Sequence, residues 1–294
     1  MVTGASGLLG RAIVRALDVR DEVRATVRRP RASDEMRALG AKVAVRPVAE
    51  PDDLIDILPR VHTLVHLVGG VNQSDDDAIL QANHGSTLAA LAAAKEAGVQ
   101  RVVFLSAPGA DPDAAHPFLR AKGLAEEAVV QSGLEHAVLR SAHAYGLGGL
   151  WFTATVVAAE AGAVLGRGDR RHAPILADDV AAVVAAIDDR RDWIEGTWQL
   201  EGPDAVTTDA LFELLDGEGA PEHLDPPEAA RRLSEWLERP ISLATAEHFA
   251  AGTPASELPD AADAFEVERT PLVAGLRAIA ARAEEAVARV ARDA

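Results

Sequence analysis

A glycine-rich segment at the start of the chain limits the possible folds more than any other feature. The segment TGASGLLG (3–10) follows the short run MVT and leads into LLGRAIVRAL, whose apolar residues recur at helical spacing. In such a strand–loop–helix unit, Gly4 permits a tight turn, Gly7 lets the backbone approach a pyrophosphate, and Gly10 lets helix and sheet pack closely. The segment therefore predicts a dinucleotide-binding loop.

Short β-branched runs alternate with helical patterns over the first 145 residues. The expected strands are residues 1–3, 22–27, 42–46, 61–69, 101–106 and 135–141. This alternation predicts an α/β fold, a Rossmann-type doubly wound parallel sheet with helices on both faces. Gly40, Gly98 and Gly133 stand between a helix and the next strand, where we expect left-handed helix ends. The first strand is short for a buried one, so either the chain starts late or this strand is weak.

Prolines divide the chain after about residue 200 into short helical pieces. The last segment carries an apolar stripe at helical spacing, formed by Leu272, Leu276, Ile279, Ala283, Val287 and Val290. We expect an NAD(P)-binding Rossmann domain over residues 1–200 and a small, mainly helical region over residues 201–294 that contacts substrate or a partner. The stripe is interpreted as a helix docked on the domain or on a partner, which leaves a homodimer or a larger complex open.

The composition excludes several kinds of site and partner. The chain of 294 residues has a formal net charge of −17, which argues against nucleic acid because phosphates would be repelled. It has no cysteine, which excludes disulfides, thiolate metal sites and cysteine nucleophiles. No apolar stretch is long enough to span a membrane and no secretory signal is readable, so we expect a cytoplasmic protein without a metal.

The residues after the second strand bear on the choice of cofactor. NAD-binding versions of this fold carry an acidic residue about 20 positions after the glycines. Here Arg28 and Arg29 follow Gly10 by 18 and 19 residues, and no acid stands there. A guanidinium suits the 2′-phosphate of NADP, so the sequence favours NADP(H) over NAD(H).

Two further strand ends carry residues suited to a ligand. Gly69 and Gly70 stand at the end of the fourth strand, and Ser106 ends the fifth. Ligands of open parallel sheets bind at this carboxyl edge. We expect the backbone at the two glycines to pass close to a ligand. Ser106 either orients a substrate carbonyl or caps the strand end.

Together these segments resemble the short-chain dehydrogenase/reductase superfamily in its extended or atypical branch. The matching pieces lie within residues 1–190, in the order of the family, and include TGASGLLG, LVHLVGG, QANHGSTLAALAAAKEAGVQRVVFLSAPGA and AKGLAEEAVVQSGLEHAVLRSAHAYG. The nearest groups are nitrogen-repression-regulator-like proteins and relatives of an accessory subunit of respiratory complex I.

The resemblance implies the residues of a cofactor site. It assigns cofactor contacts to Thr3, Gly4, Ser6, Gly7, Leu8, Leu9, Arg28, Val68, Gly69, Gly70, Asn83 and Lys122, the last on the nicotinamide ribose. Ser141 stands where the family usually carries a proline. Asp178 and Asp179 match an acidic pair that begins a helix, and we expect them to cap it.

The chain departs from the family where the reaction needs a proton donor. Phe118 stands where the family has a tyrosine four residues before Lys122. That tyrosine exchanges a proton with the substrate oxygen while hydride moves, and phenylalanine holds no such proton. Lys122 itself, His116, His143 and Tyr145 are the alternative donors. The first strand is also clipped, and the usual Gly-Asp pair after the third strand is missing.

Three functions remain open. The first is an NADP-dependent oxidoreductase that reduces a small carbonyl or conjugated substrate, with Lys122, Ser106, His143 and Tyr145 as candidate catalytic residues. The second is a non-catalytic NADP(H)-binding sensor or accessory subunit, which the phenylalanine favours. The third is a nucleotide-sugar epimerase or dehydratase.

Overall fold

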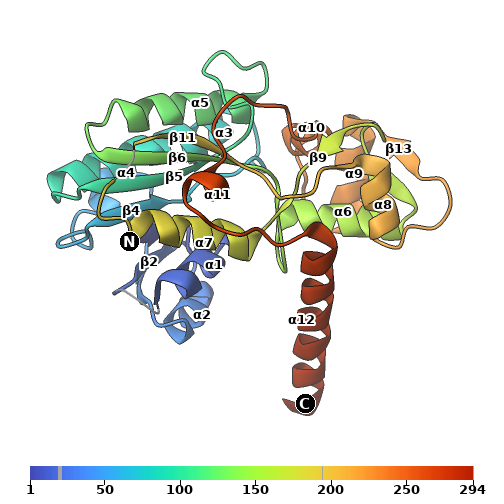
Figure 1. Ribbon diagram of the computed structural model, residues 1–294, viewed down its shortest axis with the longest axis horizontal. Coiled ribbons are helices and arrows are strands. Elements are labelled where there is room, and N and C mark those ends of the chain that lie inside the picture. The colour runs from blue at the N-terminus through green and yellow to red at the C-terminus, as the bar shows by residue number, and fades with distance from the viewer. Residues whose placement is uncertain (19–21, 194, 294) are drawn as a thin grey trace.

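A parallel sheet forms the larger part of the molecule. The computed structural model describes residues 1–18, 22–193 and 195–293, and seven strands form one sheet in the order β11-β6-β5-β4-β1-β2-β3 (Figure 1). They are β1 (Val2–Thr3), β2 (Arg24–Val27), β3 (Lys42–Val45), β4 (Thr63–His66), β5 (Arg101–Ser106), β6 (Glu135–Ser141) and β11 (Gly196–Leu200). Every neighbouring pair is parallel. The predicted Rossmann-type doubly wound fold is confirmed.

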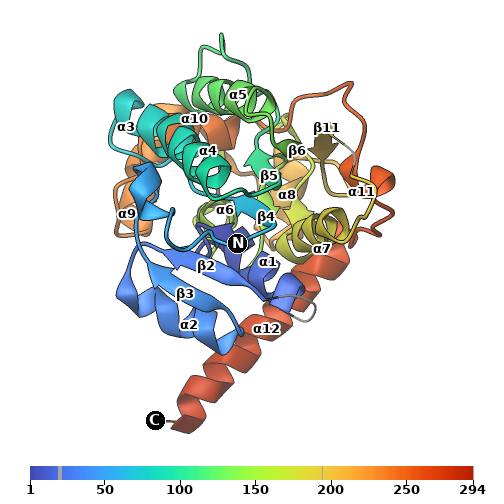
Figure 2. The same ribbon diagram turned by 90° about the vertical axis from the view of Figure 1, so that its left-hand side faces the viewer.

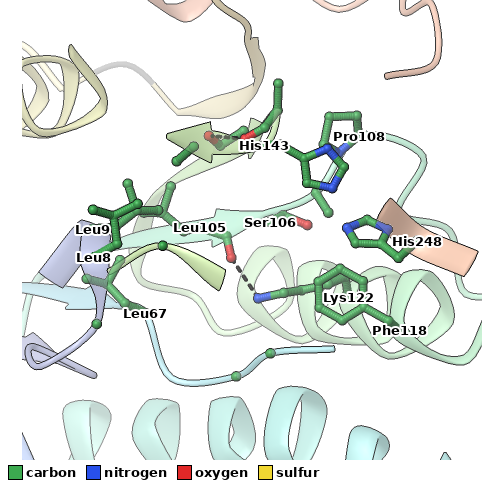
Figure 3. A pocket seen from close by; sticks show the side chains of 18 of the residues that line it. Leu8, Leu9, Leu67, Leu105, Ser106, Pro108, Phe118, Lys122, His143 and His248 are labelled. Atoms are coloured by element: carbon green, nitrogen blue, oxygen red, sulfur yellow. Dashed lines mark hydrogen bonds between the residues drawn. The ribbon is translucent and has the colours of Figure 1, made fainter. Parts of the chain in front are cut away.

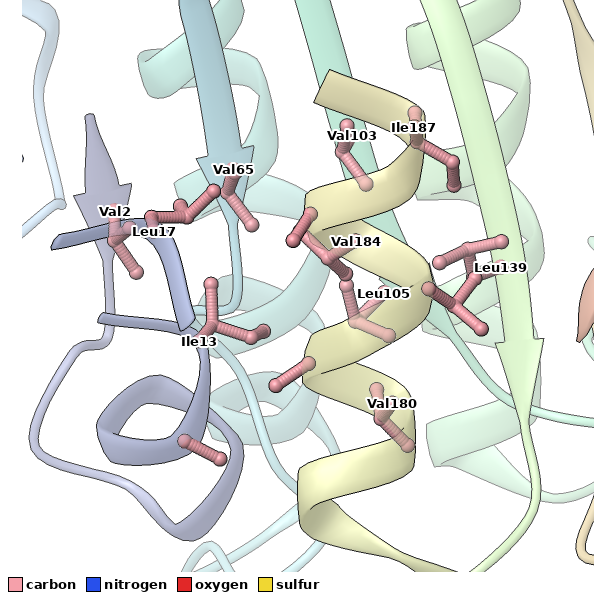
Figure 4. Packing of buried hydrophobic residues seen from close by; sticks show 14 of the residues in the cluster. Val2, Ile13, Leu17, Val65, Val103, Leu105, Leu139, Val180, Val184 and Ile187 are labelled. Carbon is pink, nitrogen blue, oxygen red and sulfur yellow. The ribbon is translucent and has the colours of Figure 1, made fainter. Parts of the chain in front are cut away.

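Helices cover both faces of the sheet, since its strands are apolar on both sides. They are α1 (Leu8–Asp18) and α7 (Ala177–Asp188) on one face, and α4 (Ser86–Glu96) and α5 (Pro117–Val130) on the other (Figure 2). Successive side chains of a strand point to opposite faces. Val103 and Leu105 of β5 therefore pack toward α7 (Figure 4), whereas Val102 and Phe104 pack toward α4 and α5. This double burial holds the strand ends in fixed positions.

The short first strand and the predicted helix ends are both confirmed. β1 has two residues, yet Val2 is fully buried and pairs with Ala25 of β2 and Val65 of β4. A neighbour on each side thus fixes a strand that is too short to be stable by itself. The three glycines that end helices are left-handed, with φ of 88° at Gly40, 72° at Gly98 and 77° at Gly133.

Two of the connections between strands are not continuous α-helices. Residues 76–96 run as α3 (Asp76–Leu80), a π-helical turn (Gln81–Gly85) and α4. Residues 51–58 form a 3₁₀ turn (Pro51–Asp53) in place of an α-helix. There Asp53 accepts hydrogen bonds from the N–H groups of Ala49 and Glu50, and Pro59 opposes further helix.

A second apolar cluster lies beside the sheet and includes most of the chain after residue 200. Its elements are α6 (Leu150–Glu160), β7 (Ala144–Tyr145), β8 (Ala163–Leu165), β9 (Arg171–His172), β10 (Ile175–Leu176), β12 (Val206–Thr207), α8 (Thr208–Leu214), β13 (Glu222–Leu224), α9 (Pro226–Trp236) and α10 (Leu243–Ala250). Residues 150–176 thus pack with the later segments. The division of the chain at residue 200 stays a prediction.

The acidic pair at the start of α7 fixes the C-terminal segment and does not cap the helix. The N-cap of α7 is Leu176, and no side chain caps it. Asp179 accepts hydrogen bonds from the backbone N–H of Thr270 (2.7 Å) and from its hydroxyl (2.9 Å). Asp178 pairs with Arg282. The predicted capping role is therefore wrong: Asp179 binds the segment that leads into the last helix, and Asp178 binds Arg282 within that helix.

The last helix, α12 (Leu272–Asp293), leaves the body of the molecule along most of its length (Figure 1). Of the predicted apolar stripe, Leu272 and Ile279 are buried against the second cluster, and Val287 and Val290 lie outside the described side chains. α11 (Ala261–Ala264) precedes it and packs on the sheet. Among the described helices, none is long and apolar enough to cross a membrane.

Candidate functional site

A cleft opens at the carboxyl ends of the sheet strands. Its volume is about 330 Å³, and it is lined by the glycine loop after β1 and by the loops that follow β4, β5 and β6 (Figure 3). α5 and α10 complete its wall. The sheet order reverses between β1 and β4, and open α/β sheets bind ligands at such a crevice.

The three glycines of the first loop meet three different steric requirements. Gly4 has a φ of 69°, and a Cβ there would lie 3.0 Å from the backbone of Leu67. A Cβ on Gly10 would lie 2.5 Å from the backbone of Ala5, so α1 packs directly on the turn. A Cβ on Gly7 would meet nothing closer than the Gly4 oxygen at 3.5 Å, and Gly7 lines the cleft. Gly7 thus leaves its face open to a ligand.

The start of α1 suits a pyrophosphate. The helix begins at Leu8, directly after the loop, so the N–H groups of its first turn have no partner within the helix. They also carry the positive end of the helix dipole. Leu8 and Leu9 line the cleft beside them. An open glycine face beside free amides fits the dinucleotide that the sequence predicts.

Asn83 holds the glycine pair after β4. Gly69 and Gly70 have φ values of 141° and 145°. The Asn83 side chain accepts from the Gly70 N–H (3.0 Å) and donates to the Gly70 carbonyl (3.1 Å) and to that of Ile79 (2.8 Å). Asn83 is fully buried and lies behind the two glycines that line the cleft. Its position supports the loop.

Thr3, Ser6 and Val68 do not line the cleft themselves. The Thr3 hydroxyl lies 2.9 Å from His66 Nδ1 and accepts a hydrogen bond from the N–H of Leu67, which ties β1 to the loop after β4. The Ser6 carbonyl accepts from the guanidinium of Arg11. These residues shape the loops, and their contacts with a cofactor stay predictions.

Arg28 and Arg29 lie at the end of β2 and are exposed. Neither side chain has a hydrogen bond or ion pair with the described residues, whereas neighbouring Arg24 binds Glu22 and the carbonyl of Ile57. Both guanidinium groups are therefore available to an anion.

Lys122 is buried at the base of the cleft. Its Nζ donates to the Leu105 carbonyl at 2.8 Å and lies 4.8 Å from the ring centre of Phe104. Burial lowers its pKa from 10.5 to about 8, and Glu126 partly offsets this. Among the described residues that line the cleft, Lys122 is the one with a charged side chain. The structure brings it together with Ser106 and with the glycine loop.

The space beside Lys122 is lined by the rings of Phe118, His143 and His248 and by the hydroxyl of Ser106. Phe118 is buried and lines the cleft together with Ser106 and His143. The Ser106 Oγ is buried without a hydrogen-bond partner among the described residues, as is Nε2 of His143. The His143 ring stacks on Trp151 at 4.9 Å. These unpaired polar atoms can bind a polar group of a ligand.

His248 is a cleft residue that no sequence pattern predicts. This residue lies on α10 and lines the cleft (Figure 3). Its ring centre lies 4.8 Å from that of Phe118 and 4.9 Å from that of His143, and both pairs are edge-to-face. Burial lowers the pKa of both imidazoles well below 6.5, and neighbouring histidines add to the effect. Both rings are therefore neutral at pH 7. No motif in the sequence around α10 signals this position.

Two other predicted donors do not line the cleft. Tyr145 is fully buried, its hydroxyl has no hydrogen-bond partner among the described residues, and it packs against Gly275 of α12. Burial raises its pKa. His116 precedes α5, and its Nε2 lies 2.9 Å from the Ala244 carbonyl. The structure thus brings Lys122, Ser106 and His143 together and leaves Tyr145 and His116 outside.

The chain is similar to proteins of known name. It is 29% identical over 228 residues to NADH dehydrogenase [ubiquinone] 1 alpha subcomplex subunit 9, mitochondrial, of Arabidopsis thaliana, which is 73% of this chain and 56% of that protein. It is 28% identical over 141 residues to the photosystem II assembly factor Ycf39 of Cyanophora paradoxa, which is 48% of this chain and 44% of that protein. The chain thus spans about half the length of these relatives.

The fold and the family are also matched. The structure of a Citrobacter sp. triphenylmethane reductase complexed with NADP(H) superposes with a TM-score of 0.75, covering 95% of this chain and 98% of that one at 19% identity, which shows a shared fold. A family model described as NAD(P)H-binding matches residues 4–190. The predicted resemblance to the atypical short-chain dehydrogenases/reductases is confirmed. Because the family match extends over more than half of the chain, this protein belongs to the NAD(P)H-binding family.

Proposed function

We propose that this protein is an NADP(H)-dependent reductase of a small carbonyl or conjugated compound. The observation that carries the proposal is the convergence of Lys122 and Ser106 on the cleft that the glycine loop forms. The Ser106 hydroxyl is buried without a partner in the part of the chain that the structure describes, which suits a carbonyl oxygen, and a lysine at the base of the cleft suits the cofactor ribose. When bound, the cofactor would supply the hydride, while this chain would bind and orient both molecules.

The lining of the cleft favours an uncharged substrate. Among the described residues that line it, none is an arginine, aspartate or glutamate, and leucines, prolines and the rings of Phe118, His143 and His248 predominate. A nucleotide sugar would bring a second diphosphate into this space, where it would find no guanidinium. The lining therefore weighs against the epimerase or dehydratase alternative.

The exposed arginines after β2 support NADPH over NADH. Arg28 directly follows β2 and its side chain has no partner among the described residues, as a 2′-phosphate site requires. We expect Arg28→Ala to weaken NADPH binding about tenfold and to leave NADH binding within about twofold, since NADH has no 2′-phosphate. Fluorescence titration of both nucleotides measures this, with Arg60→Ala as the exposed-arginine control. Equal losses for the two nucleotides would contradict the assignment.

A second candidate function is an accessory subunit that binds NADP(H) without turnover. Phe118 favours it, because a phenylalanine at this position donates no proton. The names of two relatives, a subunit of NADH dehydrogenase and a photosystem II assembly factor, favour docking to a larger complex. A homodimer is the other partner that we consider. The cytoplasm stays the predicted compartment, whereas the name of the first relative places that protein in mitochondria.

One experiment separates the two functions. The purified chain is mixed with NADPH and a panel of uncharged carbonyl and conjugated compounds, and the nucleotide absorbance is followed. The reductase proposal expects turnover with at least one compound. It also expects kcat/KM to fall about 100-fold in Lys122→Ala, because the lysine would position the cofactor ribose. Tight NADPH binding without turnover of any compound would overturn it in favour of the accessory subunit.

A further inference from the structure

Reduction of a carbonyl requires a proton as well as a hydride, and Phe118 lacks the hydroxyl that would donate it. We propose that His248 of α10 is the catalytic proton donor, placed at the cleft by the C-terminal region. This inference rests on the proposed reductase function and adds a residue to it. Its support is geometric. The ring centres of His248 and Phe118 lie 4.8 Å apart at an interplanar angle of 64°, and Phe118 is the residue that stands in place of the tyrosine.

His248 lies where the other groups of the cleft converge. Figure 3 shows the ring of His248 beside the Ser106 hydroxyl and the ring of His143, with Phe118 beneath it. The His143 and His248 ring centres are 4.9 Å apart at an interplanar angle of 61°. His248 is half-buried, so water can reach it, while it still borders the apolar lining.

The other polar groups of the cleft are less suited to donate. Lys122 directs its Nζ away from His248, toward the Leu105 carbonyl 2.8 Å away (Figure 3). His143 is held by stacking on Trp151 at 4.9 Å and 5°, with its Nε2 buried. A serine alkoxide is as basic as the substrate alkoxide that forms, so proton transfer from Ser106 to the substrate would gain no free energy. The Ser106 hydroxyl can still orient the carbonyl. His248 remains as the donor.

The proposed step balances without a further reagent. The carbonyl carbon accepts a hydride, with its electron pair, from NADPH, which is oxidised to NADP⁺. The π electrons of the carbonyl move to oxygen, and that oxygen takes the proton from the N–H of His248. The resulting imidazolate regains a proton from water. The sum is carbonyl, NADPH and water giving alcohol, NADP⁺ and hydroxide, which the solvent neutralises with one proton.

The neutral state of His248 agrees with this role. Burial and the nearby His116 keep its pKa low, so the ring enters the reaction as a neutral N–H donor. A neutral imidazole polarises the carbonyl of its substrate in triosephosphate isomerase, a known example of such chemistry. An alkoxide is a stronger base than imidazolate, so the proton moves downhill once the hydride has been added.

The test compares His248→Phe, which keeps a ring, and His248→Gln, which keeps an N–H donor, with the wild-type protein. We expect kcat for the carbonyl found in the panel to fall about 100-fold or more in His248→Phe and less in His248→Gln. The Kd for NADPH, measured by fluorescence, should stay within about threefold. His62→Gln, which changes an exposed histidine at the opposite edge of the sheet, is the matched control.

A second readout does not depend on turnover. 4-Nitrophenolate carries an oxyanion like the one that forms in the step, and its absorbance reports binding in the presence of NADP⁺. We expect His248→Phe to bind it about tenfold more weakly than wild type does, and His62→Gln to bind it equally. If phenylalanine prevents folding, His248→Ala is assayed instead, and free imidazole should restore its lost rate.

The two proposals fail in different ways. Turnover by His248→Phe at the wild-type rate, or equal binding of 4-nitrophenolate, overturns the assignment of His248 and leaves the reductase function standing. A wild-type protein that turns over no carbonyl overturns the reductase function, and the proton donor with it.

Discussion

The two sides of the cleft are determined by different parts of the chain. The loop side, residues 4–10 and 67–70, is shaped by backbone conformation and by the space that missing Cβ atoms leave. The ring side, Phe118, His143 and His248, is formed by side chains from three segments far apart in the sequence. The loop side needs particular backbone conformations, whereas the ring side depends on the identity of its side chains. Under the proposed function, the loop side would bind the cofactor and the ring side would determine the chemistry.

The largest expected effect comes from a substitution on the loop side, where Gly10 and Gly7 give opposite predictions. A Cβ on Gly10 would lie 2.5 Å from the Ala5 backbone, so α1 must move away from the turn. We expect Gly10→Ala to lower the free energy of unfolding by about 3 kcal/mol or more and to abolish NADPH binding. Gly7→Ala meets no such contact. It should change that free energy by less than about 1 kcal/mol and still weaken NADPH at least tenfold.

Urea unfolding and NADPH fluorescence distinguish the two variants. If Gly7→Ala lost stability as Gly10→Ala does, the face of Gly7 would be a packing surface and not a ligand surface. If it bound NADPH as tightly as wild type, the pyrophosphate would not approach the loop there.

The second prediction concerns Lys122, which lies between the two sides. Burial lowers its pKa to about 8, against an ordinary value of 10.5. Between these values the unfolded chain keeps a proton that the folded protein has lost, so stability rises with pH. Relative to Lys122→Met, the free energy of unfolding of the wild type should rise by roughly 3 kcal/mol from pH 8 to pH 10.5. Below pH 7 the difference should be constant.

Urea unfolding of both proteins at several pH values between 7 and 10.5 measures that difference, in which titrations common to both cancel. A difference that stayed constant over the whole range would mean that water reaches the ammonium group. Lys122 would then be less buried than the rings of Phe104 and Phe118 imply.

The contrast also explains what the sequence can predict. Gly4, Gly7 and Gly10 meet local steric requirements within eight residues, so the loop, the strand before it and the helix after it could be predicted together. Lys122 could be placed because it lies on a helix of known register. These features depend on short-range geometry, which a sequence pattern records directly.

His248 and Tyr145 show where this kind of inference stops. His248 enters the cleft because α10 packs against α9 and α5 through long-range contacts that leave no local signature. Tyr145 follows the sixth strand by four residues, as a residue of the cleft could. Its ring nevertheless lies outside the cleft and packs against Gly275 of α12. Asp179 likewise matches a cap and instead binds Thr270, 91 residues further along the chain. Tertiary packing decides each case.

The smallest expected effect is that of Tyr145→Phe, which tests whether Tyr145 belongs to the ring side of the cleft. Its hydroxyl is buried without a partner among the described residues, and such a group costs free energy. Tyr145→Phe should therefore leave kcat and the Kd for NADPH within about twofold and raise the free energy of unfolding by up to about 1 kcal/mol. A tenfold loss of kcat would restore Tyr145 as a proton donor and weaken the assignment of His248.

Gly275→Ala gives the matched test of packing, because its new methyl group would collide with the Tyr145 oxygen. Combining it with Tyr145→Phe should recover part of the stability that Gly275→Ala alone loses, since the colliding oxygen is then gone.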